Sequence, residues 1–499
     1  MGHSRKAVVI GAGVAGLAAS VRLAIQGWEV DVYERNAYPG GKLSWFEQDG
    51  YSFDAGPSLF TQPSHLEELF AEAGVPIASH FQYQQAAESC RYFFANGKQM
   101  VDWADKQALA DEMAAILGED PQSVLRYLQE SSATYEHIGQ LFVKQSLHKW
   151  RDFSWKQVGK ALAHTRPSYL FSTLNKHNAA HFRSAEAVQL FNRYATYNGS
   201  NPYKAPAMLS LIPHLEMNEG TFYPKGGMIS ITRALHELAE LKGVRFHFNA
   251  GVERIIRHDN QAKGVVINGE NLMTDVVVSN CDAYFTYLHL LKDEHAARKL
   301  LKQERSSSAL IFYWGIGKSF EQLGLHNIFF SHHYQKEFDH LFTRKTFFED
   351  PTVYINITSK METGQAPDGK ENWFVMINAP ANHGQPWQDW IPAARQRIID
   401  KLSQRLQTDI SSLIETESVL DPVTIEQRTT SYMGSLYGTS SNSKMAAFLR
   451  HPNFSNRIKG LYFVGGSVHP GGGIPLCMQS AAITAQIIAN DSRSKVSVH

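Results

Sequence analysis

The sequence predicts an α/β protein in which a Rossmann-like domain carries a mixed-sheet domain and a helical subdomain. Three observations lead to this fold class. A strand, a glycine-rich turn, a helix and a second strand follow one another over residues 7–34. A second apolar strand runs into a glycine-rich loop and a helix over residues 460–489. Between them, residues 80–220 read as helical segments dense in aromatic side chains.

Length, charge and cysteine content narrow the class of protein. The chain has 499 residues, enough for several domains of about 150 residues each. Its 48 basic residues balance 48 acidic ones, which argues against a nucleic-acid partner held by overall charge. The 3 cysteines lack paired spacing, which excludes a disulfide framework and fits a reducing, cytoplasmic compartment. The longest uncharged apolar run, residues 7–19, is too short to cross a bilayer.

The first glycine-rich turn contains Gly11, Gly13 and Gly16, each with its own physical task. The first makes a tight turn, the second lets the backbone approach a pyrophosphate, and the third lets helix and strand lie close together. The N-terminus of the next helix offers N–H donors and partial positive charge to phosphates. Glu34 ends the second strand, where a carboxylate can accept both ribose hydroxyls. This spacing predicts a bound dinucleotide.

A second loop, residues 39–42, indicates which dinucleotide is bound. It reads Pro-Gly-Gly-Lys, so Gly41 can pass close to the pyrophosphate and Lys42 can reach a phosphate. This extension resembles that of the glutathione-reductase/amine-oxidase superfamily of flavoproteins, whose ligand is FAD. NAD-dependent dehydrogenases generally lack it, so we expect FAD rather than NAD(P).

The C-terminal loop is the second strong motif. An apolar strand ends at Gly465 and Gly466, and a loop with three successive glycines leads to Ile474, Pro475 and a helix. Successive glycines permit close backbone approach to a flat ligand. The helix N-terminus would place partial positive charge on an isoalloxazine, which favours its anionic reduced form and helps it accept a hydride.

With these motifs in place, the chain resembles the phytoene-desaturase-type carotenoid desaturases over nearly its whole length. The resemblance rests on residues 54–58, 278–282, 306–308, 434–438 and 465–475. Residues 193–203 look like the branch that desaturates hydroxylated carotenoids at C3–C4. Residues 471–475 are closer to that branch and to diapocarotenoid desaturases than to the bacterial phytoene enzymes.

The resemblance implies a set of cofactor contacts by motif position, including a backbone contact to adenine from Val252 and flavin contacts around Gly466 and Pro475. The complete set expected to bind FAD is Gly11, Gly13, Ala15, Gly16, Glu34, Arg35, Gly41, Lys42, Gly56, Pro57, Val252, Asn280, Gly465, Gly466, Gly473, Ile474, Pro475 and Met478. No catalytic acid or base is named. His177 and His181 have a spacing that could ligate zinc, but no third ligand is evident, and we expect no metal site.

We expect a discontinuous domain organisation, since no linker or repeat separates the blocks. Residues 1–76, 222–300 and 441–499 form the FAD-binding domain of glutathione-reductase/amine-oxidase type. Residues 77–221 form a helical, membrane-facing substrate subdomain, and residues 301–440 form the substrate-binding domain.

The function implied by the resemblance is FAD-dependent desaturation of a long polyene in carotenoid biosynthesis, with 3,4-desaturation of a 1-hydroxycarotenoid favoured. A hydride passes to flavin N5 and a proton is lost from the adjacent carbon, which requires the C–H bond to be held about 3–3.5 Å from N5. The electron acceptor is a quinone or dioxygen. The alternatives are a phytoene or diapophytoene desaturase, a flavin-dependent carotenoid isomerase, and, from another class, a lipid-binding protein like the GDP-dissociation inhibitors.

Residues 142–176 predict peripheral membrane association, because basic residues alternate there with aromatic ones. The aromatic and leucine side chains are Phe142, Trp150, Phe153, Trp155, Tyr169, Leu170 and Phe171. A helical lid whose aromatic side chains pack inward is the alternative interpretation.

Overall fold

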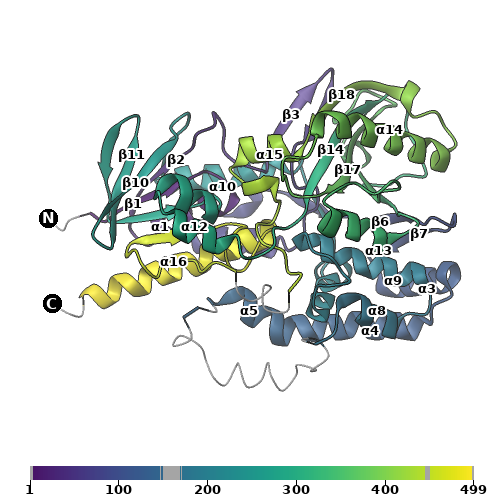
Figure 1. Cartoon of the computed structure of the whole chain (residues 1–499), viewed down its shortest axis with the longest axis horizontal. Helices are drawn as coiled ribbons and strands as arrows, with labels where there is room; N and C mark the ends of the chain where they lie inside the picture. Colours follow the sequence, from purple (N-terminus) through teal and green to yellow (C-terminus); the bar gives the residue numbers. More distant parts are fainter. Residues whose placement is uncertain (1–3, 147, 150–168, 170, 444–449, 497–499) are drawn as a thin grey trace.

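The computed structural model describes residues 4–146, 148–149, 169, 171–443 and 450–496. Figure 1 shows two sheet-containing halves side by side, with a layer of helices beneath one of them. In the half that holds both chain ends, a five-stranded parallel sheet has the order β19-β13-β1-β2-β9. Its strands are β19 (Leu461–Phe463), β13 (Val276–Ser279), β1 (Lys6–Ile10), β2 (Glu29–Tyr33) and β9 (Arg245–His247).

The parallel register brings the glycine-rich turns to one edge of this sheet. Ile10 of β1 pairs with Tyr33 of β2 and with Ser279 of β13, and Ser279 pairs in turn with Phe463. The carboxyl ends of the strands therefore lie together, as in other doubly wound sheets. Helices that cover the sheet are α1 (Val14–Ile25), α10 (Ile229–Leu241) and α16 (Ile474–Val496). A small antiparallel sheet is attached, formed by β10 (Val252–His258), β11 (Gln261–Ile267) and β12 (Glu270–Met273).

The second half is built on a seven-stranded mixed sheet of order β18-β14-β17-β16-β15-β6-β7. Its strand β14 (Ser308–Ile316), which lies between β18 and β17, is buried along its whole length, as expected for a strand covered on both faces. The other strands are β18 (Ile414–Leu420), β17 (Glu371–Ala379), β16 (Val353–Ile357), β15 (His326–Phe329), β6 (Glu88–Phe93) and β7 (Gln99–Trp103). The 20-residue helix α14 (Trp387–Leu406) packs on it through Ile398 and Leu402.

The helical layer lies below this sheet in Figure 1. Capping side chains fix its helix starts: Asp105 accepts a hydrogen bond from Ala108 N, and Asp120 one from Gln122 N. Its helices are α3 (Lys106–Leu117), α4 (Pro121–Thr134), α5 (Gln140–Lys144), α8 (Leu174–His181) and α9 (Ala185–Asn192), followed by the 3₁₀ turn η4 (Arg193–Asn198).

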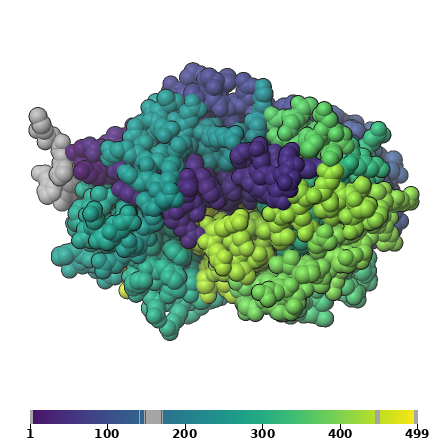
Figure 2. Space-filling view, turned by 90° about the horizontal axis from the view of Figure 1, so that it is seen from above, coloured from purple at the N-terminus to yellow at the C-terminus, as the bar shows by residue number. Residues whose placement is uncertain are grey.

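Shorter elements connect these layers. They are the hairpin β3 (Trp45–Gln48) with β4 (Tyr51–Asp54), the pair β5 (Tyr83–Gln85) with β8 (Phe222–Pro224), and the helices α2 (Ser64–Glu72), α11 (Ala283–Phe285), α12 (Glu294–Leu300), α13 (Tyr334–Asp339) and α15 (Pro422–Thr429). In the space-filling view, N-terminal residues (purple) meet the segment near 420–440 (yellow-green) across the middle of one face (Figure 2).

One secondary-structure expectation is wrong. Residues 83–103 were expected within a helical stretch, but they form β5, β6 and β7, and the last two extend the seven-stranded sheet. An aromatic side chain there packs between neighbouring strands: Phe93 of β6 stacks on Phe329 of β15, with 4.3 Å between ring centroids. The domain boundaries themselves stay a prediction. Within the part of the chain that the structure describes, no helix is long and apolar enough to span a bilayer.

Candidate active site

The first glycine-rich turn is shaped by contacts that leave no room for side chains. Gly11 adopts a left-handed φ of 94° directly after β1. A Cβ atom on Gly16 would lie 2.1 Å from the carbonyl oxygen of Gly11, so only glycine lets α1 start this close to the strand. A Cβ on Gly13 would lie 2.7 Å from Asn280 Oδ1.

The carboxylate of Glu34 is buried at the end of β2 and oriented by the backbone. Its Oε2 accepts a hydrogen bond from Ala12 N at 2.8 Å, and its Oε1 accepts one from Asn36 N at 2.9 Å. Each carboxylate oxygen has a further lone pair, which leaves acceptor capacity for a ribose.

Asn280 joins three parts of the turn region. Its Oδ1 accepts a hydrogen bond from Gly16 N at 3.0 Å, and its Nδ2 donates one to Val464 O at 3.2 Å. Gly465 lies so close that a Cβ there would be 2.5 Å from the same Nδ2. The side chain therefore fixes α1, β13 and the C-terminal loop relative to one another, a positioning role that its motif alone did not indicate.

The second loop lies against the first. A Cβ on Gly41 would be 3.5 Å from the Cα of Gly13, and Gly40 N donates to Ala12 O at 2.8 Å. Gly56 is packed even more tightly, since a Cβ there would lie 1.8 Å from Lys42 O. These glycines form a cradle that side chains would fill, as close approach of a pyrophosphate requires.

The expected residues gather around one cavity of about 680 Å³. Sixteen of the eighteen line it: Gly11, Gly13, Ala15, Glu34, Arg35, Gly41, Lys42, Gly56, Pro57, Val252, Asn280, Gly465, Gly466, Gly473, Ile474 and Pro475. Gly16 and Met478 are not among the lining residues. Gly16 permits the close packing described above, and Met478 is buried in the core beside α1.

The same cavity continues into a mostly apolar region that the sequence did not identify. This region lies between the helical layer and the seven-stranded sheet, and is lined by Phe142, Val143, Met208, Leu209, Leu211, Ile212, Leu215, Ile311, Ile328, Phe374 and Met376. Ile311 and Ile328 belong to strands β14 and β15. Their sequence signal, a continuous apolar run, is the same as that of any buried strand.

A buried polar cluster interrupts this apolar lining. Arg193 forms an ion pair with Glu216, and both side chains are almost fully buried. Tyr92 accepts from Arg193 Nε at 2.9 Å, and Tyr194 donates to Glu216 Oε1 at 3.1 Å. Arg193 and Tyr194 lie in the segment 193–203, and Tyr92 and Glu216 bind directly to Arg193. Arg193, Tyr197 and Glu216 line the cavity.

Next to this cluster, His326 is held as a neutral hydrogen-bond donor. Asn356 Nδ2 donates to Leu325 O at 3.1 Å and to His326 Nδ1 at 3.2 Å, so Nδ1 is an acceptor and the proton sits on Nε2. Burial lowers the pKa of His326 to about 3. Among the described residues, Nε2 has no hydrogen-bond partner. Tyr354 connects Nδ1 at 2.7 Å to Ser58 Oγ at 2.8 Å, two residues from Gly56.

Comparison with known proteins identifies the family of this chain. The profile of the flavin-containing amine oxidoreductases matches residues 14–489. The chain belongs to this family. It is 48% identical to a 1-hydroxycarotenoid 3,4-desaturase of Flavobacterium sp. (strain P99-3), over 97% of this chain and 99% of that protein. It is 30% identical to a phytoene desaturase of Fusarium fujikuroi, over 98% of this chain and 90% of that protein.

Solved structures agree on the fold. A variant of putrescine oxidase superposes with a TM-score of 0.64 at 13% identity, covering 99% of this chain and 100% of that one. Membership confirms the predictions of an FAD-dependent oxidoreductase and of its fold class. The glycine cradle and the oriented Glu34 carboxylate fit FAD, which supplies a hydride acceptor when bound.

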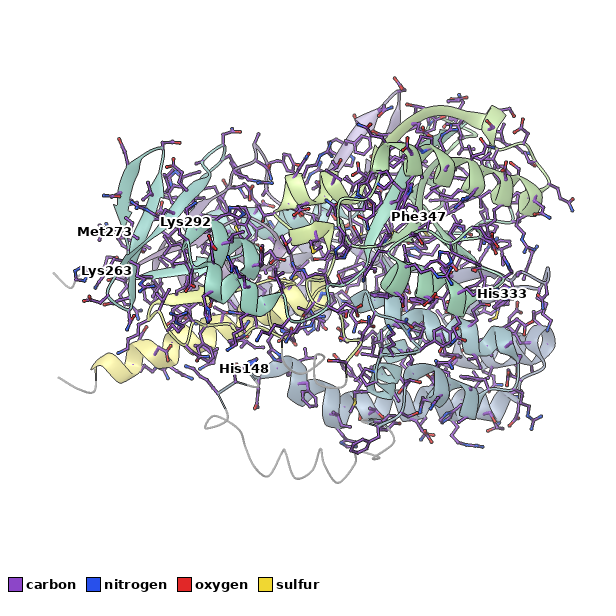
Figure 3. All side chains as sticks on the ribbon, viewed as in Figure 1. His148, Lys263, Met273, Lys292, His333 and Phe347 are labelled. Atoms are coloured by element: carbon purple, nitrogen blue, oxygen red, sulfur yellow. The ribbon has the colours of Figure 1, made fainter. Side chains whose placement is uncertain are left out.

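One residue of this flavoprotein lies differently from the expectation. Lys42 was expected at a phosphate, but its Nζ donates to Leu436 O at 2.8 Å and to Ser435 O at 3.4 Å. In the C-terminal loop, His469 Nε2 donates to Gln145 O at 2.8 Å, and its ring lies 6.2 Å from that of His148, which Figure 3 labels below α16. The described residues contain no group of three or more potential metal ligands.

Proposed function

We propose that this protein introduces the 3,4 double bond into a 1-hydroxycarotenoid. The observation that carries the proposal is a single cavity that runs from the glycine cradle into an apolar chamber with one buried polar cluster. An apolar chamber suits a long polyene, and the polar cluster suits one oxygen atom on it.

The polar residues favour a hydroxylated substrate over a hydrocarbon. A buried donor without a partner costs about 1–3 kcal/mol, and the Nε2–H of His326 is such a donor. A substrate hydroxyl could accept this hydrogen bond, whereas phytoene or another hydrocarbon could not. The hydroxyl on C1 is only a few bonds from C3, which agrees with the contact of Tyr354 to Ser58 near the cofactor loop.

The protein's part in the reaction is to bind, orient and exclude water. The apolar chamber holds the polyene, while the Ser58–Tyr354–His326 chain fixes its oxygenated end relative to Gly56 and Pro57. Positioning of this kind can lower the barrier by several kcal/mol. Hydride loss leaves a cation delocalised over the polyene, so the neighbouring C–H becomes acidic and a strong protein base is not required.

We also propose peripheral membrane binding through residues 142–176, with fewer of the segment's aromatic side chains facing the bilayer. Residues 147, 150–168 and 170 lie outside the described residues, Trp150, Phe153, Trp155 and Leu170 among them. Phe142 lines the cavity and Tyr169 is buried, so these two side chains do not face a bilayer. Phe171 is 71% exposed, and Lys176, further along the same segment, is exposed too, a combination that suits a headgroup boundary. A quinone or dioxygen would reoxidise the cofactor.

The test offers two substrates in liposomes to the FAD-loaded protein: a 1-hydroxylated acyclic polyene and the same polyene without the hydroxyl. We expect loss of two hydrogens from the hydroxylated compound, detected by mass, and at least tenfold slower conversion of the hydrocarbon. His326→Leu should abolish this preference, whereas His340→Leu, at a ring bonded to Thr346 outside the cavity, should not. Products of unchanged mass would indicate an isomerase and would overturn the proposal.

A further inference from the structure

Two cations at the cofactor end of the cavity, the partly buried Lys42 and the buried Arg450, have no carboxylate partner among the described residues. Lys42 and Arg450 both line the cavity, and Arg450 is 3% exposed. Lys42 Nζ donates to Leu436 O at 2.8 Å, and Arg450 Nη1 donates to Tyr437 O at 2.7 Å and to Gly466 O at 3.2 Å. Within the described residues, neither forms an ion pair with an acid.

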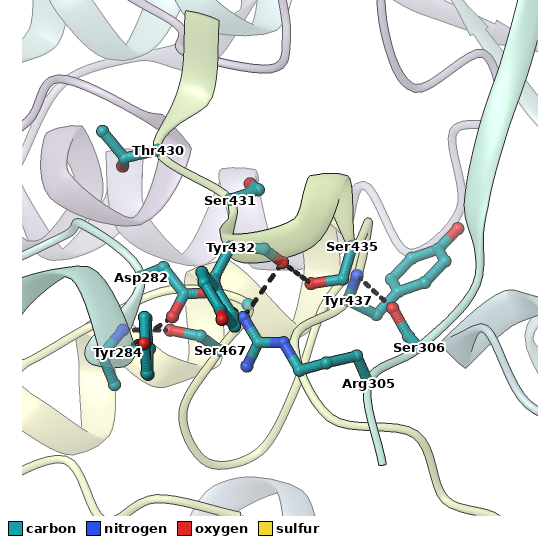
Figure 4. Close-up of polar contacts among 12 residues, drawn as sticks. Asp282, Tyr284, Arg305, Ser306, Thr430, Ser431, Tyr432, Ser435, Tyr437 and Ser467 are labelled. Carbon is teal, nitrogen blue, oxygen red and sulfur yellow. Dashed lines mark hydrogen bonds and ion pairs between the residues drawn. The ribbon is translucent and has the colours of Figure 1, made fainter. Parts of the chain in front are cut away.

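Asp282, the carboxylate whose charge acts on Lys42, is already engaged. Asp282 forms a buried ion pair with Arg305 at 2.7 Å, and Arg305 also donates to Tyr432 O at 3.3 Å. Figure 4 shows Arg305 and Asp282 beside the segment that carries Ser435 and Tyr437. Lys42, Arg305 and Arg450 therefore all donate to carbonyl oxygens of residues 432–437, and of the three only Arg305 forms an ion pair among the described residues.

An uncompensated buried charge is expensive, and proteins keep one where a ligand brings the opposite charge. Burial accordingly lowers the pKa of Lys42 to about 8 and that of Arg450 to about 10. Neutral carbonyl oxygens only partly compensate such a charge. The two cations therefore indicate that this site binds an anionic group.

The position of the two cations indicates which part of the cofactor supplies the anion. The pyrophosphate belongs to the α1 N-terminus and the cradle of Gly13 and Gly41. Arg450 instead contacts the C-terminal loop: a Cβ on Gly471 would lie 3.2 Å from its guanidinium. Both cations interact electrostatically with the Cys477 thiol in the first turn of α16, where the isoalloxazine is expected.

We propose that Lys42 and Arg450 stabilise the negative charge that the isoalloxazine carries when it is reduced. A hydride brings two electrons and one proton to the ring, so the reduced ring carries one net negative charge, which would lie on its N1–C2=O side near the two cations. The inference rests on the FAD assignment and is independent of which polyene is oxidised.

The test uses the FAD-loaded full-length protein and needs no carotenoid. Sulfite adds to flavin N5 and leaves a negative charge on the same N1–C2=O side, so its affinity reports on the two cations. We expect Lys42→Met and Arg450→Met each to retain FAD, to bind sulfite at least tenfold more weakly, and to have a lower two-electron potential by about 30 mV per tenfold effect. Lys42→Arg and Arg450→Lys should retain most of both properties.

Lys401→Met is the matched control, because Lys401 is also buried but is paired with Asp350 at 2.8 Å, far from the cofactor loops in sequence; it should change neither quantity. In the wild-type protein, the reduced flavin should keep its anionic spectrum at pH values where free reduced FAD is protonated. Unchanged sulfite affinity and potential in the Met variants would overturn the inference. So would loss of FAD from them, which would assign the charges to the pyrophosphate, or a neutral reduced flavin in the wild type.

Discussion

The two ends of the cavity are built in different ways. At the cofactor end, residues close in sequence make the site: Gly11, Gly13 and Gly16 form one turn, and their spacing alone prescribes the close contacts seen in the structure. At the polyene end, Arg193, Glu216 and His326 come from three separate elements and meet only through tertiary packing.

This difference separates two kinds of functional residue. Glycines of the cofactor end work by the absence of a side chain, so a substitution acts by steric exclusion. Side chains of the polyene end work by hydrogen bonding in a low-dielectric setting, so a substitution acts by leaving a partner unsatisfied. Variants at the two ends should therefore differ in which ligand they lose.

The largest effect is expected from Gly13→Val. The new Cβ would lie 2.7 Å from Asn280 Oδ1, and its methyl groups would occupy the approach to the pyrophosphate. We expect FAD binding to fall by more than about a hundredfold, measured from flavin absorbance after reconstitution and desalting. Gly369→Ala, at an open turn with a φ of 75°, is the control and should keep its flavin. Flavin retained by Gly13→Val would show that the cradle lies elsewhere.

Arg193→Met should lower the stability of the protein and leave its FAD binding intact. It leaves the buried carboxylate of Glu216 without its cation, and breaking such a pair costs about 3–5 kcal/mol. Denaturant unfolding should show this loss, while the FAD affinity of the folded protein stays within about twofold of the wild-type value. The double variant Arg193→Met, Glu216→Gln should recover part of the stability; no recovery would mean that the pair does not carry the effect.

The sequence predicted the cofactor end far better than the polyene end for a physical reason. A turn that admits only glycine leaves a local pattern, and Gly41 or Gly473 could be placed from such patterns alone. The pairing of β15 with β6, which brings His326 next to the cluster, joins residues more than two hundred positions apart. Lys42 shows a third case, since its position in the loop was predictable and the direction of its long side chain was not.

Asn280→Ala should lower both the stability of the protein and its FAD affinity moderately, because it removes the link between α1 and the C-terminal loop. The lost hydrogen bonds to Gly16 N and Val464 O predict a loss of about 1–3 kcal/mol in unfolding free energy and roughly tenfold in FAD affinity. Asn280→Asp, which keeps the acceptor for Gly16 N, should lose less affinity than the alanine variant. Equal losses of FAD affinity in the two variants would show that the acceptor for Gly16 N does not contribute to FAD binding.

The smallest effect is a pH dependence at the cofactor end. Burial lowers the pKa of Lys42 from 10.5 to about 8, so the unfolded chain holds this proton more tightly than the folded one. The stability of the cofactor-free protein should therefore rise between about pH 8 and 10.5, and the sulfite affinity of the FAD-loaded protein should fall, because the anionic sulfite adduct favours the charged lysine. Both trends should disappear in Lys42→Met, as thermal unfolding and sulfite titration over this range would show; persistence of both would point to another group.

The most direct test joins the two ends in one anaerobic turnover. The FAD-loaded protein is mixed with a limiting amount of a 1-hydroxylated polyene, and flavin bleaching and product mass are recorded together. We expect one flavin to be bleached for each product molecule, with each product two hydrogens lighter than the substrate. Product without bleaching, or bleaching without a lighter product, would contradict the transfer of a hydride from the polyene to FAD within this cavity.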